Sequence, residues 1–120
     1  DGANLFCRMP IAMTKAALGG EADVPTIDGA GAKLKIPPGT QTGQQFRLRG
    51  KGMSLINSDA RGDLYIETFV ETPINLDKKQ QDLLRQLDKT LGDEKTASRH
   101  SPEASGFFNK VKDFWNDLKE

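Results

Sequence analysis

Apolar and polar residues alternate in short runs over the first three quarters of the chain, and glycine or proline separates the runs. Residues 5–11 read Leu-Phe-Cys-Arg-Met-Pro-Ile, which predicts a first strand with a largely apolar face. Leu5, Cys7, Met9 and Ile11 share that face. We therefore expect Cys7 to be a buried, unreactive thiol, while Phe6 points to the opposite side of the strand.

A short helix and a hairpin are predicted next. Thr14 is a helix-capping residue type, residues 15–18 favour helix, and Gly19-Gly20 follows as a stop signal. Residues 24–27 and 33–36 then flank Asp28-Gly29, a turn dipeptide. The pattern indicates two antiparallel strands with a glycine-rich tip.

Residues 36–52 are the stretch richest in turn-forming residues. Pro37 and Pro38 have no backbone N–H, and glycine recurs at positions 39, 43, 50 and 52. Between these turns Phe46 and Leu48 alternate with Arg47 and Arg49. We expect a strand between two shaped turns, followed by a loop over residues 53–59.

Residues 64–71 should form the longest strand. Leu64 and Ile66 are expected to face the core, together with either Phe69 or Val70. Thr72-Pro73 ends the strand, because proline lacks a donor and restricts the residue before it.

Two helices are predicted after the strands. Asp77 and Gln80 have the spacing of a capping box, and Gly92 is a helix stop. The apolar positions between them form one narrow stripe: Leu83, Leu84, Leu87 and Leu91. Residues 93–100 are polar and poor in aromatics, which is typical of a flexible connector.

The second of these helices begins at Ser101-Pro102-Glu103. Its apolar positions recur at helical spacing: Phe107, Phe108, Val111, Phe114, Trp115 and Leu118. They include three of the six phenylalanines and the only tryptophan. This face can dock on its own domain, on a partner subunit or on a membrane surface, although a charge-balanced polar face disfavours the membrane.

Composition excludes several classes of function. The formal net charge is +0, with 17 basic and 17 acidic residues, so the chain has no overall electrostatic footprint for nucleic acid or anionic membrane. A single cysteine permits neither a disulfide framework nor a multi-cysteine zinc site within the chain. No apolar run approaches the ~20 residues that span a bilayer.

Candidate chemistry is sparse. Gly50-Lys51-Gly52 lacks the spacing of a phosphate-binding loop. One strand face is weakly basic, with Arg47, Arg49 and Lys51. Binding of nucleic acid through this face is therefore kept as an alternative function. His100 lies in the predicted connector without a nucleophile or carboxylate constellation. We predict no catalytic residue and no metal ligand, and therefore no enzyme.

Several motifs, in order, carry a family likeness. They are Leu18-Gly19-Gly20-Glu21, residues 24–29, residues 36–43, residues 46–52, Gly62-Asp63-Leu64-Tyr65 and residues 71–76. From residue 1 to about residue 91 the chain closely resembles the second carboxy-terminal β-domain of the DnaJ family, the J-domain co-chaperones of DnaK. The helix over residues 101–118 is similar to the extreme carboxy terminus of bacterial members.

The resemblance implies a mainly β fold: a small β-sandwich-like domain with one short helix, followed by two carboxy-terminal helices. It implies a β-domain over residues 1–76 that holds unfolded client segments, and a helical dimerisation region over residues 77–120 with its connector at 93–100. The family's His-Pro-Asp and cysteine-rich repeats are absent from this sequence. Zinc is therefore expected only in a cysteine-rich region outside it, and contact with a DnaK-type chaperone only through the full-length protein.

The resemblance implies a cytoplasmic co-chaperone, and we expect it to bind neither nucleic acid nor membrane. We predict two binding surfaces, one for client peptide and one for the homodimer. For client peptide we predict Phe6, which lies off the core face, and Met13, whose flexible side chain suits a surface of many shapes. For the homodimer we predict a leucine seam with an aromatic clamp: Leu84, Leu87, Leu91, Phe107, Phe108, Phe114 and Trp115.

Overall fold

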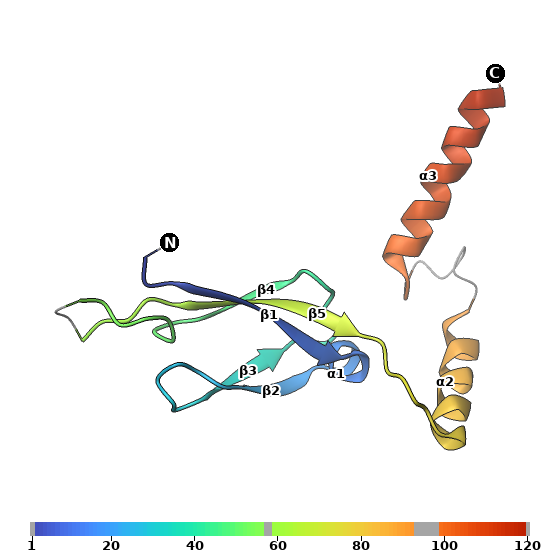
Figure 1. Ribbon diagram of the computed structural model, residues 1–120. Helices are drawn as coiled ribbons and strands as arrows, with labels where there is room; N and C mark the ends of the chain where they lie inside the picture. The colour runs from blue at the N-terminus through green and yellow to red at the C-terminus, as the bar shows by residue number, and fades with distance from the viewer. Residues whose placement is uncertain (1, 57–58, 93–98, 120) are drawn as a thin grey trace. The chain divides into compact units, whose positions relative to one another are not determined.

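The computed structural model describes residues 2–56, 59–92 and 99–119 (Figure 1). The chain divides into two units, Asp1–Ile74 and Asn75–Glu120. The boundary lies two residues before the one predicted from the sequence. Most of the predicted connector, residues 93–98, falls outside the described residues.

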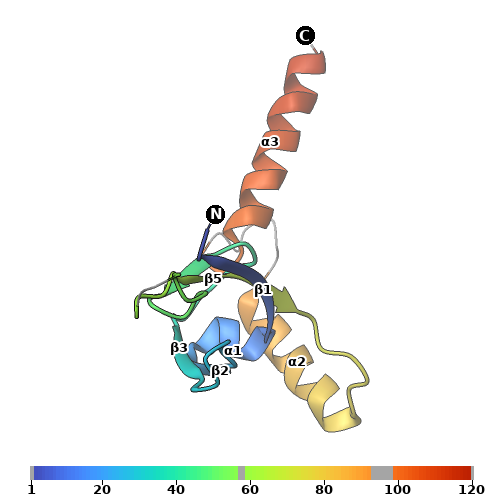
Figure 2. The ribbon, with the colours of Figure 1, turned by 60° about the vertical axis from the view of Figure 1, so that its left-hand side comes forward.

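The first unit combines strands with one short helix. Its elements are β1 (Leu5–Ala12), α1 (Met13–Leu18), β2 (Gly20–Val24), β3 (Ala32–Ile36), β4 (Gln45–Leu48) and β5 (Leu64–Glu71). β1, β5 and β4 form one sheet in that order, and β2 pairs with β3 in a second. Both ribbon views show the β2–β3 hairpin as a layer facing the three-stranded sheet (Figures 1 and 2). The mainly β, sandwich-like prediction is confirmed.

The two ends of the unit's sequence meet in the three-stranded sheet. β1 runs parallel to β5, with Leu5 opposite Leu64 and Phe6 opposite Tyr65. β4 runs antiparallel to β5 on its other side, with Arg47 opposite Tyr65. β5 is therefore the central strand, and β1 and β4 are the sheet's edges.

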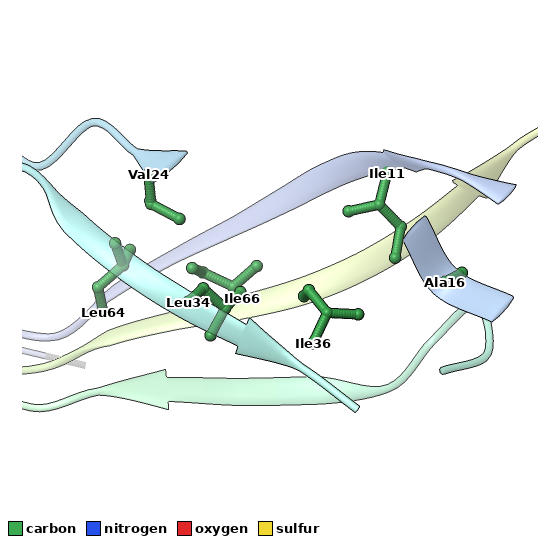
Figure 3. Packing of buried hydrophobic residues seen from close by; sticks show 7 residues of the cluster. All are labelled: Ile11, Ala16, Val24, Leu34, Ile36, Leu64 and Ile66. Atoms are coloured by element: carbon green, nitrogen blue, oxygen red, sulfur yellow. The ribbon is translucent and has the colours of Figure 1, made fainter. Parts of the chain in front are cut away.

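The core fills the space between the two layers (Figure 3). Its buried apolar members are Ile11, Ala16, Val24, Leu34, Ile36, Leu64 and Ile66. Ile36 and Ile66 are almost completely inaccessible to solvent. Val70 packs against this cluster, which answers the question between Phe69 and Val70 in favour of Val70.

The turn-rich stretch ties α1 to β5. The backbone N–H groups of Gly39 and Thr40 donate to the carbonyl of Ala16, at 2.8 and 3.0 Å, and so occupy an acceptor in the short helix. Gly43 donates to the carbonyl of Thr68 at 2.8 Å. The prolines and glycines of this stretch therefore shape a segment that holds α1 and β5 together.

Two glycines allow three segments to meet near the start of the chain. Met53 donates to the carbonyl of Ala3 at 2.7 Å, and Gly52 donates to the carbonyl of Gly62 at 2.9 Å. A Cβ atom at Gly52 would lie 2.5 Å from the oxygen of Ala3, and one at Gly62 would collide with the same peptide group. Both positions need glycine because backbone approaches too closely for a side chain.

The second unit contains α2 (Lys78–Leu91) and α3 (Pro102–Lys119). The Asp77 carboxylate accepts from the N–H of Gln80 at 2.8 Å, and the Gln80 side chain accepts from the N–H of Asp77 at 2.9 Å. The predicted capping box and the stop at Gly92 are both present.

Four local predictions were wrong. Cys7 is exposed, because it lies on β1, an edge strand of its sheet. α1 starts at Met13 after Ala12, so Thr14 lies inside the helix and is not its cap. The first hairpin strand is Gly20–Val24, not residues 24–27. β5 has 8 residues, as β1 does, so it is not the longest strand.

Candidate functional site

Phe6 belongs to an aromatic pair on the outer face of the three-stranded sheet. Its ring stacks on Tyr65, with centroids 5.1 Å apart and planes 12° from parallel. The Arg47 guanidinium lies 5.8 Å from the Tyr65 ring centre. Phe6 remains 67% exposed. The parallel pairing of β1 and β5 thus turns a large apolar side chain into an accessible, preorganised surface.

A second group lies two residues farther along the same face. The Arg8 guanidinium sits 4.3 Å from the centre of the Phe69 ring, within cation–π range. Its Nε lies 3.8 Å from a carboxylate oxygen of Glu67. These contacts hold Arg8 over the sheet while its side chain stays 60% exposed.

Met13, the other predicted client residue, is not brought together with Phe6. It is the first residue of α1 and is half-buried. The two residues are seven positions apart along extended chain, which corresponds to roughly 20 Å. The client role of either residue stays a prediction, but they do not belong to one pocket.

The basic face proposed for nucleic acid is largely paired within the fold. Arg47 donates from Nε to the Asp63 carboxylate at 2.7 Å, and Asp63 also accepts from the N–H of Gly50 at 2.8 Å. The Gly50 N–H, followed by the Arg47 guanidinium, lowers the pKa of Asp63, and Asp63 raises the pKa of Arg47. Arg47 therefore already has an anionic partner.

Lys51 has an acidic partner as well. Its Nζ lies 3.1 Å from a carboxylate oxygen of Asp28, which joins the tip of the β2–β3 hairpin to the turn after β4. The Thr26 hydroxyl, the N–H of Ala30 and then Lys51 all lower the pKa of Asp28. Two of the three cations in the nucleic-acid alternative are thus paired with carboxylates of the strand unit.

The predicted leucine seam lies along one side of α2. At about 100° per residue, Leu83, Leu84, Leu87 and Leu91 fall within one narrow sector of the helix. Leu84 and Leu91 are half-buried, and Leu87 is exposed. No residue of α2 is buried.

The predicted aromatic clamp is similarly accessible on α3. Phe107, Phe114 and Trp115 are 61%, 59% and 56% exposed. Phe107 meets Phe108 edge to face at 5.6 Å between centroids, and Phe114 meets Trp115 in the same way at 5.8 Å. The aromatic side chains therefore form two clusters on a single helix face.

Among the described residues, no group of three or more His, Cys, Asp or Glu side chains gathers where a metal ion could be held. His100 lies in an exposed turn before α3. Within the described ranges, no helix is long and apolar enough to cross a membrane.

Sequence reasoning missed Arg8, Tyr65 and Phe69 as companions of Phe6. Alternation within residues 64–71 already places Tyr65 on the face opposite Ile66. What the sequence does not show is that β1 and β5, about 60 residues apart, are neighbours in register. Without that pairing, Phe6 appears as an isolated exposed residue.

Comparisons with known proteins agree with this architecture. The family model described as DnaJ C terminal domain matches residues 1–73, and the model described as Chaperone protein DnaJ C-terminal region matches residues 79–117. The chain is 63% identical over its full length to Chaperone protein DnaJ of Rhodospirillum centenum and 60% identical to that of Paramagnetospirillum magneticum.

A third relative, Chaperone protein DnaJ of Acidiphilium cryptum, is 59% identical over 98% of the chain. The chain covers 30% of the first and third relatives and 31% of the second, so it spans about a third of their length. The family match covers both the strand unit and the helical unit. The chain belongs to the DnaJ C-terminal domain family.

Proposed function

We propose that this chain is the client-holding and dimer-forming part of a DnaJ-type co-chaperone. The first unit binds segments of unfolded polypeptide, and the helices of the second unit join two copies. Membership of the DnaJ C-terminal domain family over both units supports this proposal. The role is one of binding, without a reaction catalysed by this chain.

The observation that carries the dimer is the exposed apolar face of α3. Three of the chain's six phenylalanines and its only tryptophan lie on this helix. No α3 residue with a described exposure is buried. Full burial of one such side chain is worth about 1.5–3 kcal/mol. A second copy offers the same surface in return, as a twofold-symmetric interface requires.

Client binding is assigned to the strand unit, with Phe6 as its first residue. The exposed ring of Phe6 is already held in place by stacking on Tyr65, so it offers apolar contact with little further loss of side-chain entropy. Met13 is retained as a second, separate candidate. Neither nucleic acid nor membrane is a partner in this proposal.

The remaining parts of the proposal concern the full-length protein. Cooperation with a DnaK-type chaperone would occur through regions outside this chain. No cofactor is assigned to this chain, and zinc would belong to a cysteine-rich region elsewhere. Action in the cytoplasm rests on the family alone.

Sedimentation equilibrium tests the dimer. The full chain should be a dimer, and a version that ends at His100 should dissociate at much lower concentration. A monomer in both cases at high micromolar concentration would exclude the dimer.

Titration with an unfolded, apolar peptide tests client holding. We expect weak binding that changes little between 50 and 200 mM salt, since apolar contacts dominate. Binding to double-stranded DNA with a steep salt dependence would replace the proposal with the nucleic-acid alternative.

A further inference from the structure

The tip of the β2–β3 hairpin contains a chemically reactive pair of residues, Asp28-Gly29. The backbone N–H of Gly29 donates to the carbonyl of Thr26 at 3.0 Å, so the pair lies within a tight turn. Glycine has no side chain that would hinder an approach to its nitrogen, and nothing lies within 4 Å of the position that a Cβ at Gly29 would occupy. An aspartate that precedes glycine can therefore close a ring onto the backbone.

The reaction is aspartate isomerisation, and it needs no reagent other than water. The nitrogen of Gly29 bonds to the side-chain carboxyl carbon of Asp28, and the proton of that nitrogen leaves with the carboxyl OH as water. A second water molecule then opens the resulting succinimide ring at either of its carbonyls. Opening at the main-chain carbonyl leaves isoaspartate, in which the backbone runs through the former side chain and is longer. Such a product would disturb the hydrogen bonds of the turn.

The ring closure has two requirements. The carboxyl group must be neutral, because an ionised carboxylate resists attack by a nucleophile and its oxygen is a poor leaving group. The attacking nitrogen must also be free to give up its proton. The fold can therefore control the reaction through the charge of Asp28 and through the hydrogen bond of Gly29.

Three donors keep the Asp28 carboxyl group ionised. It accepts from the Thr26 hydroxyl at 2.5 Å, from the N–H of Ala30 at 3.0 Å and from Lys51 Nζ at 3.1 Å. These donors, with Thr26 first, lower the pKa of Asp28, and its side chain is only 20% exposed. The neutral form that ring closure requires is therefore rare in the folded chain.

The same turn opposes the loss of the Gly29 proton, which is held in the hydrogen bond to Thr26. Thr26 is fixed in turn, because its hydroxyl accepts from the N–H of Gly31 at 2.9 Å. These contacts are local to the hairpin tip. Lys51 differs from them, since it lies in the turn after β4 and its side chain is only 27% exposed where it meets Asp28. Lys51 therefore ties the reactive pair to a distant part of the strand unit.

We propose that Asp28-Gly29 is a latent site of isoaspartate formation, which the ion pair with Lys51 keeps unreactive while the hairpin tip is held against the turn after β4. Release of the tip exposes the pair to ring closure, and the covalent change then prevents the original turn from forming again. This inference concerns the covalent stability of the strand unit. It depends neither on client binding nor on the dimer.

The first test compares the whole chain with a free peptide of residues 22–33 during incubation in mildly acidic buffer. Trypsin releases Asp28 in the fragment of residues 16–33, apart from the Asp1-Gly2 pair in residues 1–8, and mass spectrometry with chromatography quantifies isoaspartate. The folded chain should react at least about tenfold more slowly than the peptide, since each unit of pKa changes the neutral fraction tenfold. In denaturing urea the two rates should agree. Equal rates without urea would overturn the proposal.

Variants at Lys51 test the long-range contact. Lys51→Gln should raise the rate of isoaspartate formation at Asp28 about two- to fivefold, because the carboxylate loses a cationic partner. Lys51→Arg, which keeps the charge, should react nearly as slowly as the unaltered chain. Lys35→Gln is the matched control, since Lys35 is an exposed lysine of β3. Equal rates for Lys51→Gln and Lys35→Gln would overturn the role of Lys51.

The pH dependence of the reaction tests the mechanism in the unaltered chain, so the proposal stays falsifiable even if Lys51→Gln does not fold. In the free peptide the rate should rise as the pH falls toward the ordinary pKa of aspartate, near 3.9. In the folded chain this rise should occur at lower pH, over the range in which circular dichroism shows that the chain remains folded. A rise at the same pH in the chain and the peptide would contradict control through the charge of Asp28.

Discussion

Thr68 lies on the core face of β5 and is completely inaccessible to solvent. Its hydroxyl is 2.9 Å from the carbonyl oxygen of Gln41 and 3.0 Å from that of Gln44. A buried hydroxyl is tolerated only with such partners. Through Thr68 the turn-rich stretch that precedes β4 is fixed to the central strand.

Replacing Thr68 with valine keeps the shape of the side chain and removes the donor. We expect Thr68→Val to lower the free energy of unfolding by about 1–2 kcal/mol, because the hydroxyl's hydrogen bonds to the carbonyls of Gln41 and Gln44 are lost. Urea unfolding followed by circular dichroism measures the change. Thr90→Val, on the exposed surface of α2, is the matched control and should stay within about 0.5 kcal/mol. Equal losses in the two variants would refute the role of Thr68.

A second prediction concerns the close backbone contact at Gly62. A methyl group there would strike the peptide of Ala3, so Gly62→Ala should destabilise the strand unit by about 1–3 kcal/mol. Gly106→Ala is the control, since nothing lies within 4 Å of a Cβ at that position of α3. The midpoint of thermal unfolding of the strand unit should fall for Gly62→Ala alone. An unchanged midpoint would mean that the three segments do not approach so closely.

Asp63 couples stability to pH. Its pKa is lower in the fold than in the unfolded chain, because Gly50 and Arg47 stabilise the carboxylate. Such a group stabilises the fold at pH values above its unfolded pKa near 3.9, and this contribution disappears as the pH falls through the folded pKa. Asp63→Asn should therefore lower the melting temperature at pH 7, and its difference from the unaltered protein should shrink toward pH 3. Asp88→Asn is the exposed control, and a difference for Asp63→Asn that stays constant with pH would contradict the assignment.

Among the helices and strands, the sequence predicted correctly those whose ends are determined by residues close together in the chain. The capping box of α2 depends on Asp77 and Gln80, three residues apart, and it forms as expected. The first hairpin strand was misplaced because Pro25 has no donor and Thr26 turns the chain by accepting from the N–H of Gly31. The strand therefore lies earlier, where residues 20–24 pair with residues 32–36.

Prediction of the candidate sites from the sequence was limited in the same way. Periodicity identified the exposed apolar stripe of α3, since helical spacing is a local property. It did not identify the companions of Phe6 or the exposure of Cys7, because both depend on which strand lies next to β1. Parallel pairing between strands about 60 residues apart leaves no mark in either segment alone.

The apolar stripe of α3 leads to a prediction about association. Phe114→Ala combined with Trp115→Ala should raise the dissociation constant of the dimer by at least about 30-fold, because buried aromatic side chains dominate interfaces. Asn109→Ala, on the opposite side of the same helix, should leave it nearly unchanged. Sedimentation equilibrium measures both. Equal dissociation constants for the double variant and the unaltered chain would show that the dimer interface lies elsewhere.

For the whole molecule, the proposed dimer would matter because one strand unit offers only a small surface for client binding. Two weak sites on one assembly can raise the affinity for a long client by roughly 10²–10⁴ without any new contact. A short client segment, which reaches a single site, gains nothing. We therefore predict that the gain in affinity on dimerisation depends on the length of the client.

The most direct test compares a permanently unfolded protein with a short apolar peptide from its sequence. The dimer should bind the long client at least about 10²-fold more tightly than the peptide. The Phe114→Ala, Trp115→Ala variant should lose that advantage and bind the peptide as before. If this variant is monomeric and still binds the long client as tightly as the dimer does, joining two client sites is not what the helices contribute.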